Sequence, residues 1–448
     1  MKYIIKLIPD TPESGINARN NQGLHNPCIF AISCLFIIFT LSLFRDTPSA
    51  RAAVHHGIWL SYVDFEDAGL YNKTEEEFTD AAEYIFTNLE TYGFNNVYFH
   101  VRAFDDAIYP GSSFDWCGYL SKKPLKYDTL SILIDAAHRH NIKFHAWINP
   151  YRITLDDIYD PSEESTTEHI TAGVREIIEN YDVDGIHFDD YFYPAAHKGN
   201  QFFKVSAKDR MNNVNKMIHT VYETIKSYDN NILFGISPAG NIEYAKSIGC
   251  DLDTWFSKEG YIDYIIPQLY WSDNYRIGGK KVKYFTQTLN EWTSLNTGNI
   301  PMYIGLALYK AGTRREEDPG WIRSGHNIAD QLRAIKSYKC NGEVLFSYKY
   351  LFTPDGKKEA ANYVRYISGL KISKTAISLK KGKKYNLAKQ ISVKKHFKTV
   401  FRYTSANKKI AAVTKTGIIT ARKKGRTRIT VKGIAQSKVS CIVKVLSY

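Results

Sequence analysis

Two adjacent carboxylates, Asp189 and Asp190, follow the short apolar run at residues 185–188. The run has the composition of a buried strand, and Pro194 cannot donate a ladder hydrogen bond, so we expect the strand to end beside these carboxylates. Acidic residues at the carboxyl end of a buried parallel strand are typical of catalytic residues in barrel enzymes. Two carboxyl groups across a glycosidic bond supply the proton donor and the nucleophile or base of glycoside hydrolysis.

Asp189 is the first choice for the catalytic carboxylate. Residues two apart on a strand share a face, so Asp189 and His187 would both point into the barrel, whereas Asp190 would point toward the helices or the loop. The pair could instead cap the next segment or neutralise Arg102. The expected partner is Asp273, which follows the run Pro267-Gln268-Leu269-Tyr270-Trp271. Three other carboxylates remain alternatives to Asp273, namely Asp190, Asp64 and Asp106.

Polar and aromatic residues near the expected strand ends are candidates for binding a polysaccharide. Gln268 and Tyr270 could hydrogen-bond a sugar and Trp271 could stack on it, although a Tyr-Trp pair also packs well inside a barrel. Arg102 could bind a carboxylate or a sugar hydroxyl, or could only neutralise Asp189. The complete set of predicted substrate-binding residues is Asp64, Arg102, Asn149, Tyr151, His187, Tyr191, Gln268, Tyr270 and Trp271.

Three histidines, His100, His145 and His187, lie on consecutive predicted strands and raise the alternative of an open zinc site. Such a site would suit a metal-dependent deacetylase or amidase, but interior histidines that bond their neighbours are the simpler interpretation. The six cysteines show no C-x-x-C spacing, so neither a zinc site nor a disulfide framework is supported. We therefore expect neither a metal nor another cofactor.

The elements that must position these residues repeat along the chain. Eight apolar, β-branched or aromatic runs occur at residues 57–64, 96–104, 142–149, 185–189, 232–237, 264–270, 302–309 and 344–350. Segments of helical period lie between them, and the first is announced by the capping box Thr74-Glu75-Glu76-Glu77 and stops at Gly93. Eight strands alternating with helices predict an α/β fold, a (β/α)₈ TIM barrel over residues 54–368.

The N-terminus carries an export signal. Residues 28–44 are almost continuously apolar, basic residues precede them, and Ala50-Arg51-Ala52 provides the small residues of a cleavage site. We expect residues 1–53 to be a signal peptide cut after Ala52, with a retained membrane anchor as the alternative. Either segment places the rest of the chain outside the membrane, secreted or attached to the cell surface.

The C-terminal residues 371–448 differ sharply in charge from the rest of the chain. They hold 22 of the 59 basic residues and none of the 46 acidic ones, in short alternating runs separated by glycine turns. The pattern predicts a small all-β sandwich of the immunoglobulin type. Its charge favours binding to anionic cell-wall polymers or a membrane surface, with a solubilising spacer as the alternative. Nucleic acid is not an expected partner, because the chain is exported and shows no nucleic-acid module.

Long motifs at the predicted strands resemble those of the bacterial glycosyl-hydrolase-like family ten. They are residues 57–64, 97–102, 143–152, 183–194 and 267–271, and the resemblance covers residues 54–368. It implies an extracellular TIM-barrel glycosidase that acts on a cell-surface glycan, here peptidoglycan strands stripped of their peptides. The tail resembles the group-two bacterial immunoglobulin-like domain in residues 378–382, 403–413 and 424–431.

Residues 184–191 are also similar to the D-G-x-D-x-D-x-E signature of chitinase-type barrels. Asp184, Gly185 and Asp189 match it, whereas His187 replaces an Asp and Tyr191 replaces the acid Glu. These departures leave the stereochemical course of the reaction open. They also leave a second function possible, that of a non-catalytic glycan-binding or adhesion protein whose barrel lacks the catalytic acid.

Overall fold

The computed structural model describes residues 54–195, 201–322, 325–395, 397 and 399–447. The expected signal peptide or anchor at residues 1–53 lies outside these residues. Within them, no helix is both long enough and apolar enough to cross a bilayer.

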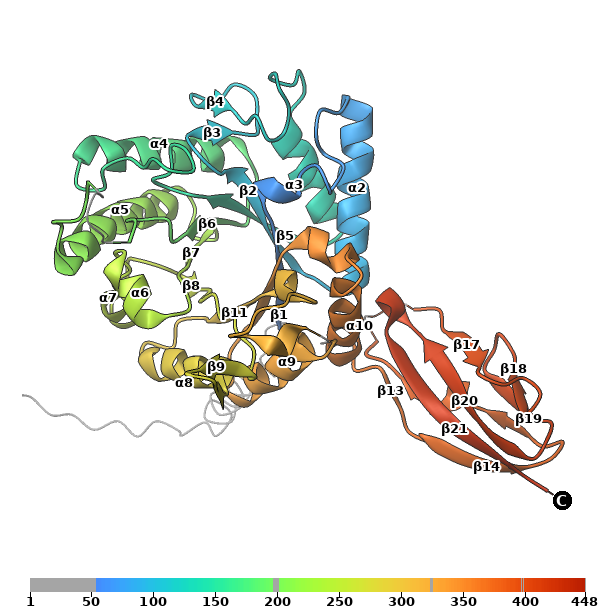
Figure 1. Cartoon of the computed structure of the whole chain (residues 1–448). Helices are drawn as coiled ribbons and strands as arrows, with labels where there is room; N and C mark the ends of the chain where they lie inside the picture. The colour runs from blue at the N-terminus through green and yellow to red at the C-terminus, as the bar shows by residue number, and fades with distance from the viewer. Residues whose placement is uncertain (1–53, 196–200, 323–324, 396, 398, 448) are drawn as a thin grey trace, which may run out of the picture. The chain divides into compact units, whose positions relative to one another are not determined.

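A parallel sheet of eight strands, in the order β11-β12-β1-β2-β5-β6-β7-β8, forms the barrel (Figure 1). Isolated parallel bridges, Ile265 to Met302 and Gln268 to Gly305, join β8 to β11 and close the ring. The predicted (β/α)₈ barrel is confirmed. Its strands are β1 (His55–Leu60), β2 (Asn96–Arg102), β5 (Lys143–Ile148), β6 (Gly185–Asp189), β7 (Leu233–Ser237), β8 (Tyr264–Ile265), β11 (Tyr303–Leu306) and β12 (Gly342–Phe346).

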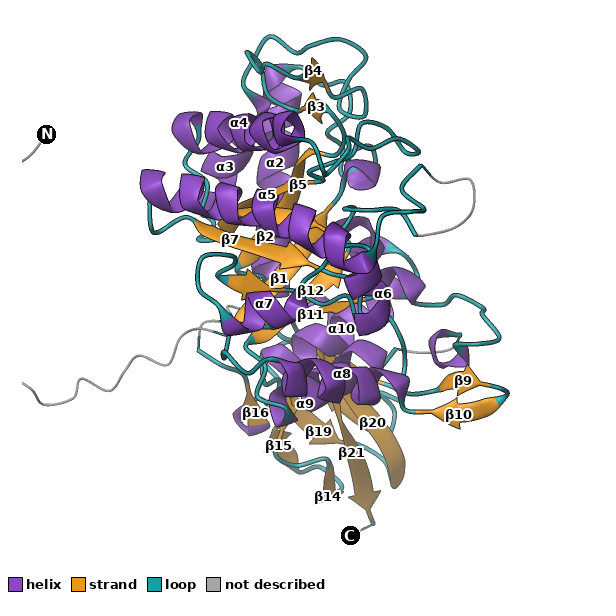
Figure 2. Ribbon diagram, turned by 90° about the vertical axis from the view of Figure 1, so that its left-hand side faces the viewer, coloured by secondary structure: helices purple, strands orange, loops and turns teal. Residues whose placement is uncertain are grey.

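Helices surround the strands, and Figure 2 shows α4 and α5 lying over the sheet from the side. The capping box at the start of α2 is confirmed, with Thr74 and Glu77 bonding each other's backbone N–H, and Gly93 ends the helix at φ 82°. Helices α6 and α7 were not expected. The helices are α2 (Glu75–Tyr92), α3 (Thr129–Arg139), α4 (Glu164–Asn180), α5 (Ala207–Tyr228), α6 (Ile242–Ser247), α7 (Leu252–Ser257), α8 (Tyr284–Leu295), α9 (Asn327–Ser337) and α10 (Gly356–Ile367).

Several strands end earlier than the apolar runs from which they were predicted. The chain leaves β1 at Leu60 because the Asp64 carboxylate accepts the Ser61 amide, which turns residues 62–64 into a 3₁₀ helix. Strand β8 has only two residues, and Pro267 just beyond it cannot donate a ladder hydrogen bond. Short elements occupy the connections: β3 (Asp106–Ala107), β4 (Asp115–Trp116), β9 (Tyr275–Ile277), β10 (Lys280–Val282), η1 (Tyr62–Asp64), η2 (Leu308–Lys310), η3 (Pro319–Trp321) and η4 (Tyr348–Phe352).

Buried aromatic and imidazole rings fill the barrel interior below the carboxyl ends of the strands. The Tyr264 hydroxyl lies 3.3 Å from Nδ1 of both His145 and His187, and Nε2 of His187 lies 3.1 Å from the Ser237 hydroxyl. Burial lowers the pKa of His145 to about 4 and holds the pKa of His187 well below its usual range. These histidines are therefore neutral packing groups, and the described residues contain no cluster suited to a metal ion.

The C-terminal domain is all-β, as predicted. A four-stranded sheet, β14-β21-β20-β17, and a three-stranded sheet, β15-β19-β18, bury a small apolar core that includes Leu387, Ile429 and Val443. Alternation along β20 and β21 places apolar side chains inside and basic ones outside. Its strands are β13 (Lys371–Ile372), β14 (Ala376–Lys380), β15 (Lys384–Asn386), β16 (Ile391–Ser392), β17 (Arg402–Ser405), β18 (Ala411–Val413), β19 (Ile418–Ala421), β20 (Gly425–Lys432) and β21 (Lys438–Leu446), with η5 (Ala388–Gln390) and η6 (Ile434–Gln436) between them.

Candidate active site

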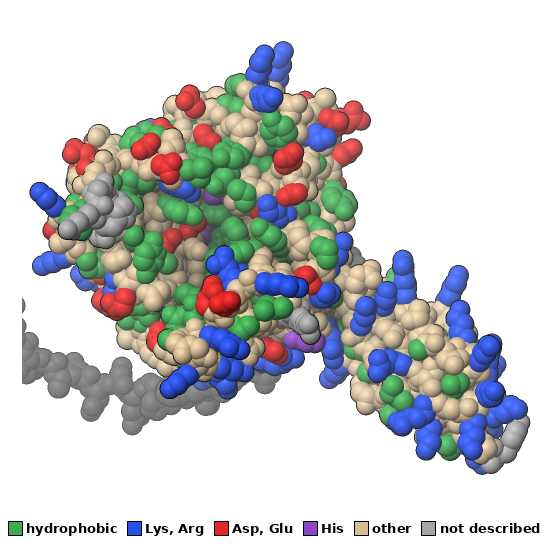
Figure 3. All heavy atoms as spheres, viewed as in Figure 1, with side chains coloured by type: hydrophobic (Ala, Val, Ile, Leu, Met, Phe, Trp, Pro, Cys, Tyr) green, Lys and Arg blue, Asp and Glu red, His purple; other side chains and the backbone are tan. Residues whose placement is uncertain are grey.

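A cavity of about 180 Å³ lies at the carboxyl ends of the barrel strands. Figure 3 looks onto this face and shows a hollow near its centre, bordered by hydrophobic side chains. One carboxylate, that of Asp189, is among the residues that line it. The lining residues are Trp59, Trp147, Asp189, Tyr191, Ser237, Gln268, Tyr270, Tyr309 and Phe346. Two larger surface hollows, of about 710 and 580 Å³, contain none of the predicted site residues.

Asp189 ends strand β6 on the cavity floor and is 8% exposed. Its Oδ1 accepts hydrogen bonds from Nε2 of Gln268 at 2.9 Å, from the backbone N–H of Asp190 at 2.9 Å and from the Ser237 hydroxyl at 3.4 Å. Burial raises the pKa of the Asp189 carboxyl, and these hydrogen bonds oppose the rise. The carboxyl is thus fixed in orientation and sits in a place that disfavours its charge.

Asp190 turns away from the cavity, as the strand alternation predicts, toward the loop after β7. One of its carboxylate oxygens accepts the backbone N–H of Ala239 at 2.5 Å. Burial and the neighbouring charge of Asp189 hold the pKa of Asp190 well above its usual range. Two carboxyl groups this close titrate as a pair, so the pair keeps a proton at pH values where isolated carboxyls are ionised.

Three of the predicted binding residues line the same cavity as Asp189: Tyr191, Gln268 and Tyr270. Gln268 holds Asp189 and also donates to the backbone carbonyl of Ser237 at 2.8 Å, so its amide orients the carboxyl. Sequence reasoning missed Trp59, Trp147, Ser237, Tyr309 and Phe346. Four of these five are the last or next-to-last residue of a barrel strand, and alternation along each strand would have indicated them, whereas Tyr309 lies in η2 after β11.

Asp273 and Trp271 do not line the cavity. The Asp273 carboxylate accepts the backbone N–H and the hydroxyl of Thr286, at 2.9 and 2.6 Å, and so caps the first turn of α8. The Trp271 ring packs on Tyr284, in the same helix. The carboxylate of Asp273, the expected catalytic partner, therefore caps a helix. Strand alternation could not place it, because the chain is no longer in strand conformation beyond β8.

Asp64, Asn149 and Tyr151 also lie outside the cavity. Asp64 is fully buried and accepts the Ser61 amide at 2.8 Å and the Ser347 hydroxyl at 2.9 Å, and burial raises its pKa to about 6. Asn149 donates to the carbonyl of Ala103 at 2.8 Å and ties β5 to the end of β2. The Tyr151 ring is buried against Phe192. All three shape the strand ends rather than the cavity surface.

Strand alternation would place Arg102 in the barrel interior with His100, but the structure does not. The register of β2 against β5 shifts between these two residues, because a β-bulge inserts one extra residue, and side chains beyond it face the opposite way. The Arg102 guanidinium instead stacks on Phe114 at 3.3 Å and contacts the Asp105 carboxylate at 3.4 Å. Helix α4 approaches it at Gly173, where a methyl group would overlap the guanidinium.

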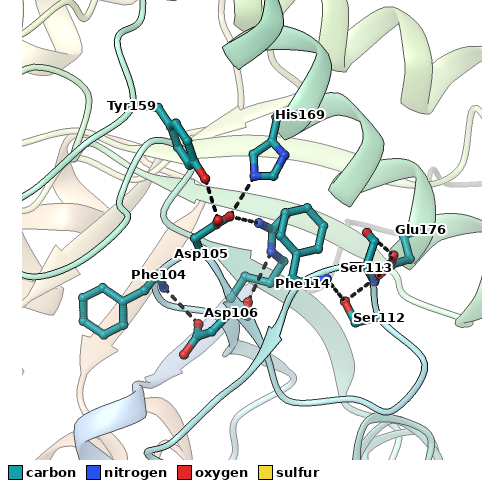
Figure 4. Close-up of polar contacts among 10 residues, drawn as sticks. Phe104, Asp105, Asp106, Ser112, Ser113, Phe114, Tyr159, His169 and Glu176 are labelled. Carbon is teal, nitrogen blue, oxygen red and sulfur yellow. Dashed lines mark hydrogen bonds and ion pairs between the residues drawn. The ribbon is translucent and has the colours of Figure 1, made fainter.

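Asp105 is the centre of this outer cluster. It accepts the Tyr159 hydroxyl at 2.5 Å and contacts Nε2 of His169 at 2.8 Å, and Figure 4 shows both side chains converging on it. Arg102 also donates from Nε to the carbonyl of Asp106 at 3.3 Å. Arg102 therefore joins the loop after β2 to helix α4 and does not reach Asp189.

Comparison with known proteins gives matches to both parts of the chain. The family model described as Glycosyl hydrolase-like 10 matches residues 55–164 and 156–323. The model of the bacterial Ig-like domain (group 2) matches residues 367–443. The family matches agree with the barrel and with the all-β domain described above.

Two curated relatives are named glycosyl hydrolases. Glycosyl hydrolase YngK of Bacillus subtilis (strain 168) is 31% identical over 301 residues, which cover 53% of this chain and 57% of that protein. The chain thus spans little more than half the length of this relative. Glycosyl hydrolase DigH of Escherichia coli (strain K12) is 27% identical over 387 residues, which cover 69% of this chain and 86% of that protein.

Among solved structures, the PgaB (BpsB) glycoside hydrolase domain from Bordetella bronchiseptica is similar, with a TM-score of 0.49 and 9% identity over 69% of this chain and 99% of that one. A glycoside hydrolase family 18 N-acetylglucosaminidase from Paenibacillus barengoltzii gives a TM-score of 0.45 and 12% identity, over 69% and 99% of the two chains. The assignment of the barrel rests on its own strand order.

Proposed function

The chain belongs to the glycosyl hydrolase-like 10 family, and we propose that it is a secreted or surface-held glycosidase that cleaves cell-wall polysaccharide, with Asp189 as a catalytic carboxylate. The substrate that we infer is the glycan strand of peptidoglycan. The observation that carries the proposal is a single buried carboxyl on the floor of an aromatic-walled cavity at the catalytic end of the barrel.

The raised pKa of the Asp189–Asp190 pair suits proton transfer to a leaving oxygen, because a pair whose pKa lies above the usual carboxyl range holds a proton that it can donate as a general acid. Gln268 and Ser237 hold the Asp189 oxygen in one place, which aligns the proton donor with the bond to be cut. The rings of Tyr191, Tyr270 and Tyr309, which line the cavity and are not fully buried, offer flat surfaces on which a sugar can lie.

The test measures release of soluble sugar from peptidoglycan, with and without its stem peptides, by wild-type protein and by Asp189→Asn. We expect the substitution to lower turnover by about 10²- to 10⁴-fold, the usual contribution of a general acid or base. Asp273→Asn is the matched control, because it makes the same chemical change in a carboxyl that caps α8 outside the cavity. Thermal unfolding of each variant checks that the fold is kept.

Full activity of Asp189→Asn would overturn the assignment of Asp189. A second function, non-catalytic glycan binding, is favoured by one observation: Asp189 is alone among carboxylates in the cavity lining, and Tyr191 stands where chitinase-type barrels carry the acid Glu. Binding of the polymer by wild-type protein without any release of sugar would support that second function.

For the C-terminal domain, we propose binding to anionic cell-wall polymers. The support is its charge, 22 basic residues and no acidic one, much of it on exposed side chains such as Arg422, Lys423 and Lys424. Many weak contacts of this kind are screened by salt, so we expect retention on isolated cell walls to fall steeply as NaCl rises above about 0.15 M.

The matched variants are a triple Lys/Arg→Gln change at Arg422, Lys423 and Lys424, and the same change at the exposed barrel residues Lys122, Lys123 and Lys126. Sedimentation with cell walls, before and after chemical removal of their phosphate-rich polymers, measures retention. Weaker retention for the C-terminal triple alone supports the proposal. Equal retention of both variants and of wild type, on both kinds of wall, would indicate a spacer.

A further inference from the structure

Arg152 is a buried cation beside the cavity that has no acidic partner among the described residues. Its side chain is 9% exposed, and its Cζ lies 4.2 Å from the centre of the Tyr191 ring and 5.1 Å from that of Phe104. Nη2 donates to the backbone carbonyl of Leu155 at 3.3 Å. The ion pairs of the described residues include none to Arg152.

A guanidinium carries five N–H donors, and taking its charge out of water is costly unless an anion or several acceptors replace the solvent. Stacking on two rings recovers part of that cost. The Tyr62 hydroxyl is close enough for Arg152 to oppose the rise that burial produces in the pKa of Tyr62. Neither contact supplies the carboxylate that buried arginines usually have.

One aromatic ring links Arg152 to the reacting carboxyl. Tyr191 stacks on the guanidinium and also lines the cavity, and the charge of Asp189 is the largest cause of the raised pKa of Tyr191. An anion held by Arg152 would therefore lie beside the Tyr191 ring that also borders the cavity of Asp189.

A second, independent observation lies in the wall of the same cavity. Trp147 lines it and is 3% exposed, yet its Nε1 has no hydrogen-bond partner among the described residues. Its ring stacks at 3.7 Å on His100, whose Nδ1 lies 3.5 Å from the Ser61 hydroxyl. An unmet buried donor is rare in folded proteins, and the indole N–H of Trp147 is one that an oxygen acceptor of a ligand in this cavity would satisfy.

We propose that Arg152 binds a carboxylate carried by the sugar at this cavity, so that the protein selects acidic glycans. The inference rests on the proposed function, and it names a specificity residue for it. A guanidinium pairs with a carboxylate through two parallel hydrogen bonds, which fixes the orientation of the sugar as well as its charge. The carboxylate can belong to a lactyl ether on an amino sugar or to a uronic acid, since both place it next to a pyranose ring.

The test is calorimetric binding of three oligosaccharides of equal length to the full chain carrying Asp189→Asn, so that hydrolysis does not intervene. The first is a peptide-free peptidoglycan fragment, the second is the same fragment with its carboxylates converted to methyl amides, and the third is an oligouronate. We expect the free acid to bind about 10- to 100-fold more tightly than its amide, the usual strength of a hydrogen bond to a charged group.

Adding Arg152→Met should bring the two affinities together while changing the affinity for the amide by less than about twofold, and Arg152→Lys should keep part of the preference. Selection of the oligouronate with the same dependence on Arg152 would assign the carboxylate to a uronic acid. An acid-to-amide ratio that survives Arg152→Met, or the absence of any preference for an acid, would overturn the proposal.

The two proposals fail separately in this design. If wild-type protein releases no sugar but the ratio of the affinities for acid and amide depends on Arg152, the glycosidase proposal is refuted and the carboxylate-binding site is supported. Sugar release without any such ratio would keep the glycosidase and refute the carboxylate site. Equal losses for acid and amide in Arg152→Met would show that Arg152 only supports Tyr191.

Discussion

The buried arginines Arg102 and Arg152 differ in one respect: Arg102 has a carboxylate partner in its own chain, and Arg152 has none among the described residues. Arg102 is 4% exposed, stacks on Phe114 and meets a carboxylate of its own chain, Asp105. Arg152 is almost as buried and also stacks on rings, but the described residues give it a backbone carbonyl and no carboxylate.

The difference separates an arginine that holds the fold from one that is kept for a ligand. The Arg102 pair is closed, since Tyr159 and His169 occupy the remaining positions on Asp105 and Phe114 covers the guanidinium. The wall around Arg152 differs, since no carboxylate of the described residues pairs with Arg152 and Nε1 of Trp147 has no hydrogen-bond partner among them. A buried arginine that pairs with a carboxylate of its own chain contributes to stability. A buried arginine without such a partner can instead contribute to ligand recognition.

The largest effect on stability should come from breaking the closed pair. We expect Arg102→Met to lower the free energy of unfolding by about 2–4 kcal/mol, because it leaves a charge without its partner. Arg152→Met, the matched change, should alter it by less than about 1 kcal/mol, because the lost stacking is offset by removal of an uncompensated charge. Urea unfolding of both variants measures this, and equal losses would erase the distinction.

A smaller effect is expected at Asp64, a fully buried carboxyl that accepts hydrogen bonds from the Ser61 amide and the Ser347 hydroxyl and has no cationic partner among the hydrogen bonds and ion pairs of the described residues. Its raised pKa of about 6 means that the folded state holds this proton more tightly than the unfolded state. Stability therefore falls as the pH rises from about 4 to about 6, by at most about 3 kcal/mol.

Asp64→Asn removes this titration, so we expect its unfolding free energy relative to wild type to increase between pH 4 and pH 7. Asp80→Asn, on the exposed face of α2, is the control and should show no such change. A constant difference between Asp64→Asn and wild type at both pH values would contradict the assignment, because it would mean that the folded and unfolded states bind the Asp64 proton equally well.

Much of the fold could be predicted because it rests on patterns that are local in sequence. Each barrel strand is an apolar run of strand length, and the helix after β1 carries a capping box and a glycine stop that the structure keeps. The sandwich pattern of the tail follows from the alternation along β20 and β21. None of these signals depends on a distant contact.

The candidate site could be predicted only as far as strand alternation held. It placed Asp189 and His187 in the barrel interior, but a bulge of one residue reversed Arg102, and no local pattern announces that bulge. Beyond β8, Asp273 could not be assigned because its partner, Thr286, lies in the next helix. The unpaired state of Arg152 depends on four segments at once, and so it is visible only in three dimensions.

The lack of acidic residues in the C-terminal domain gives it a nearly constant charge. Lysine and arginine keep their protons up to about pH 10, and residues 371–448 contain no Asp or Glu, so that His396 is the one residue whose type titrates near neutral pH and it adds at most one charge to the 22 of lysine and arginine. Acidification that neutralises the carboxyls of the barrel leaves this domain almost unchanged. A large change in wall retention between mildly acidic and mildly alkaline conditions would therefore report on the polymer or on the barrel, and the domain would act as a nearly fixed electrostatic reference.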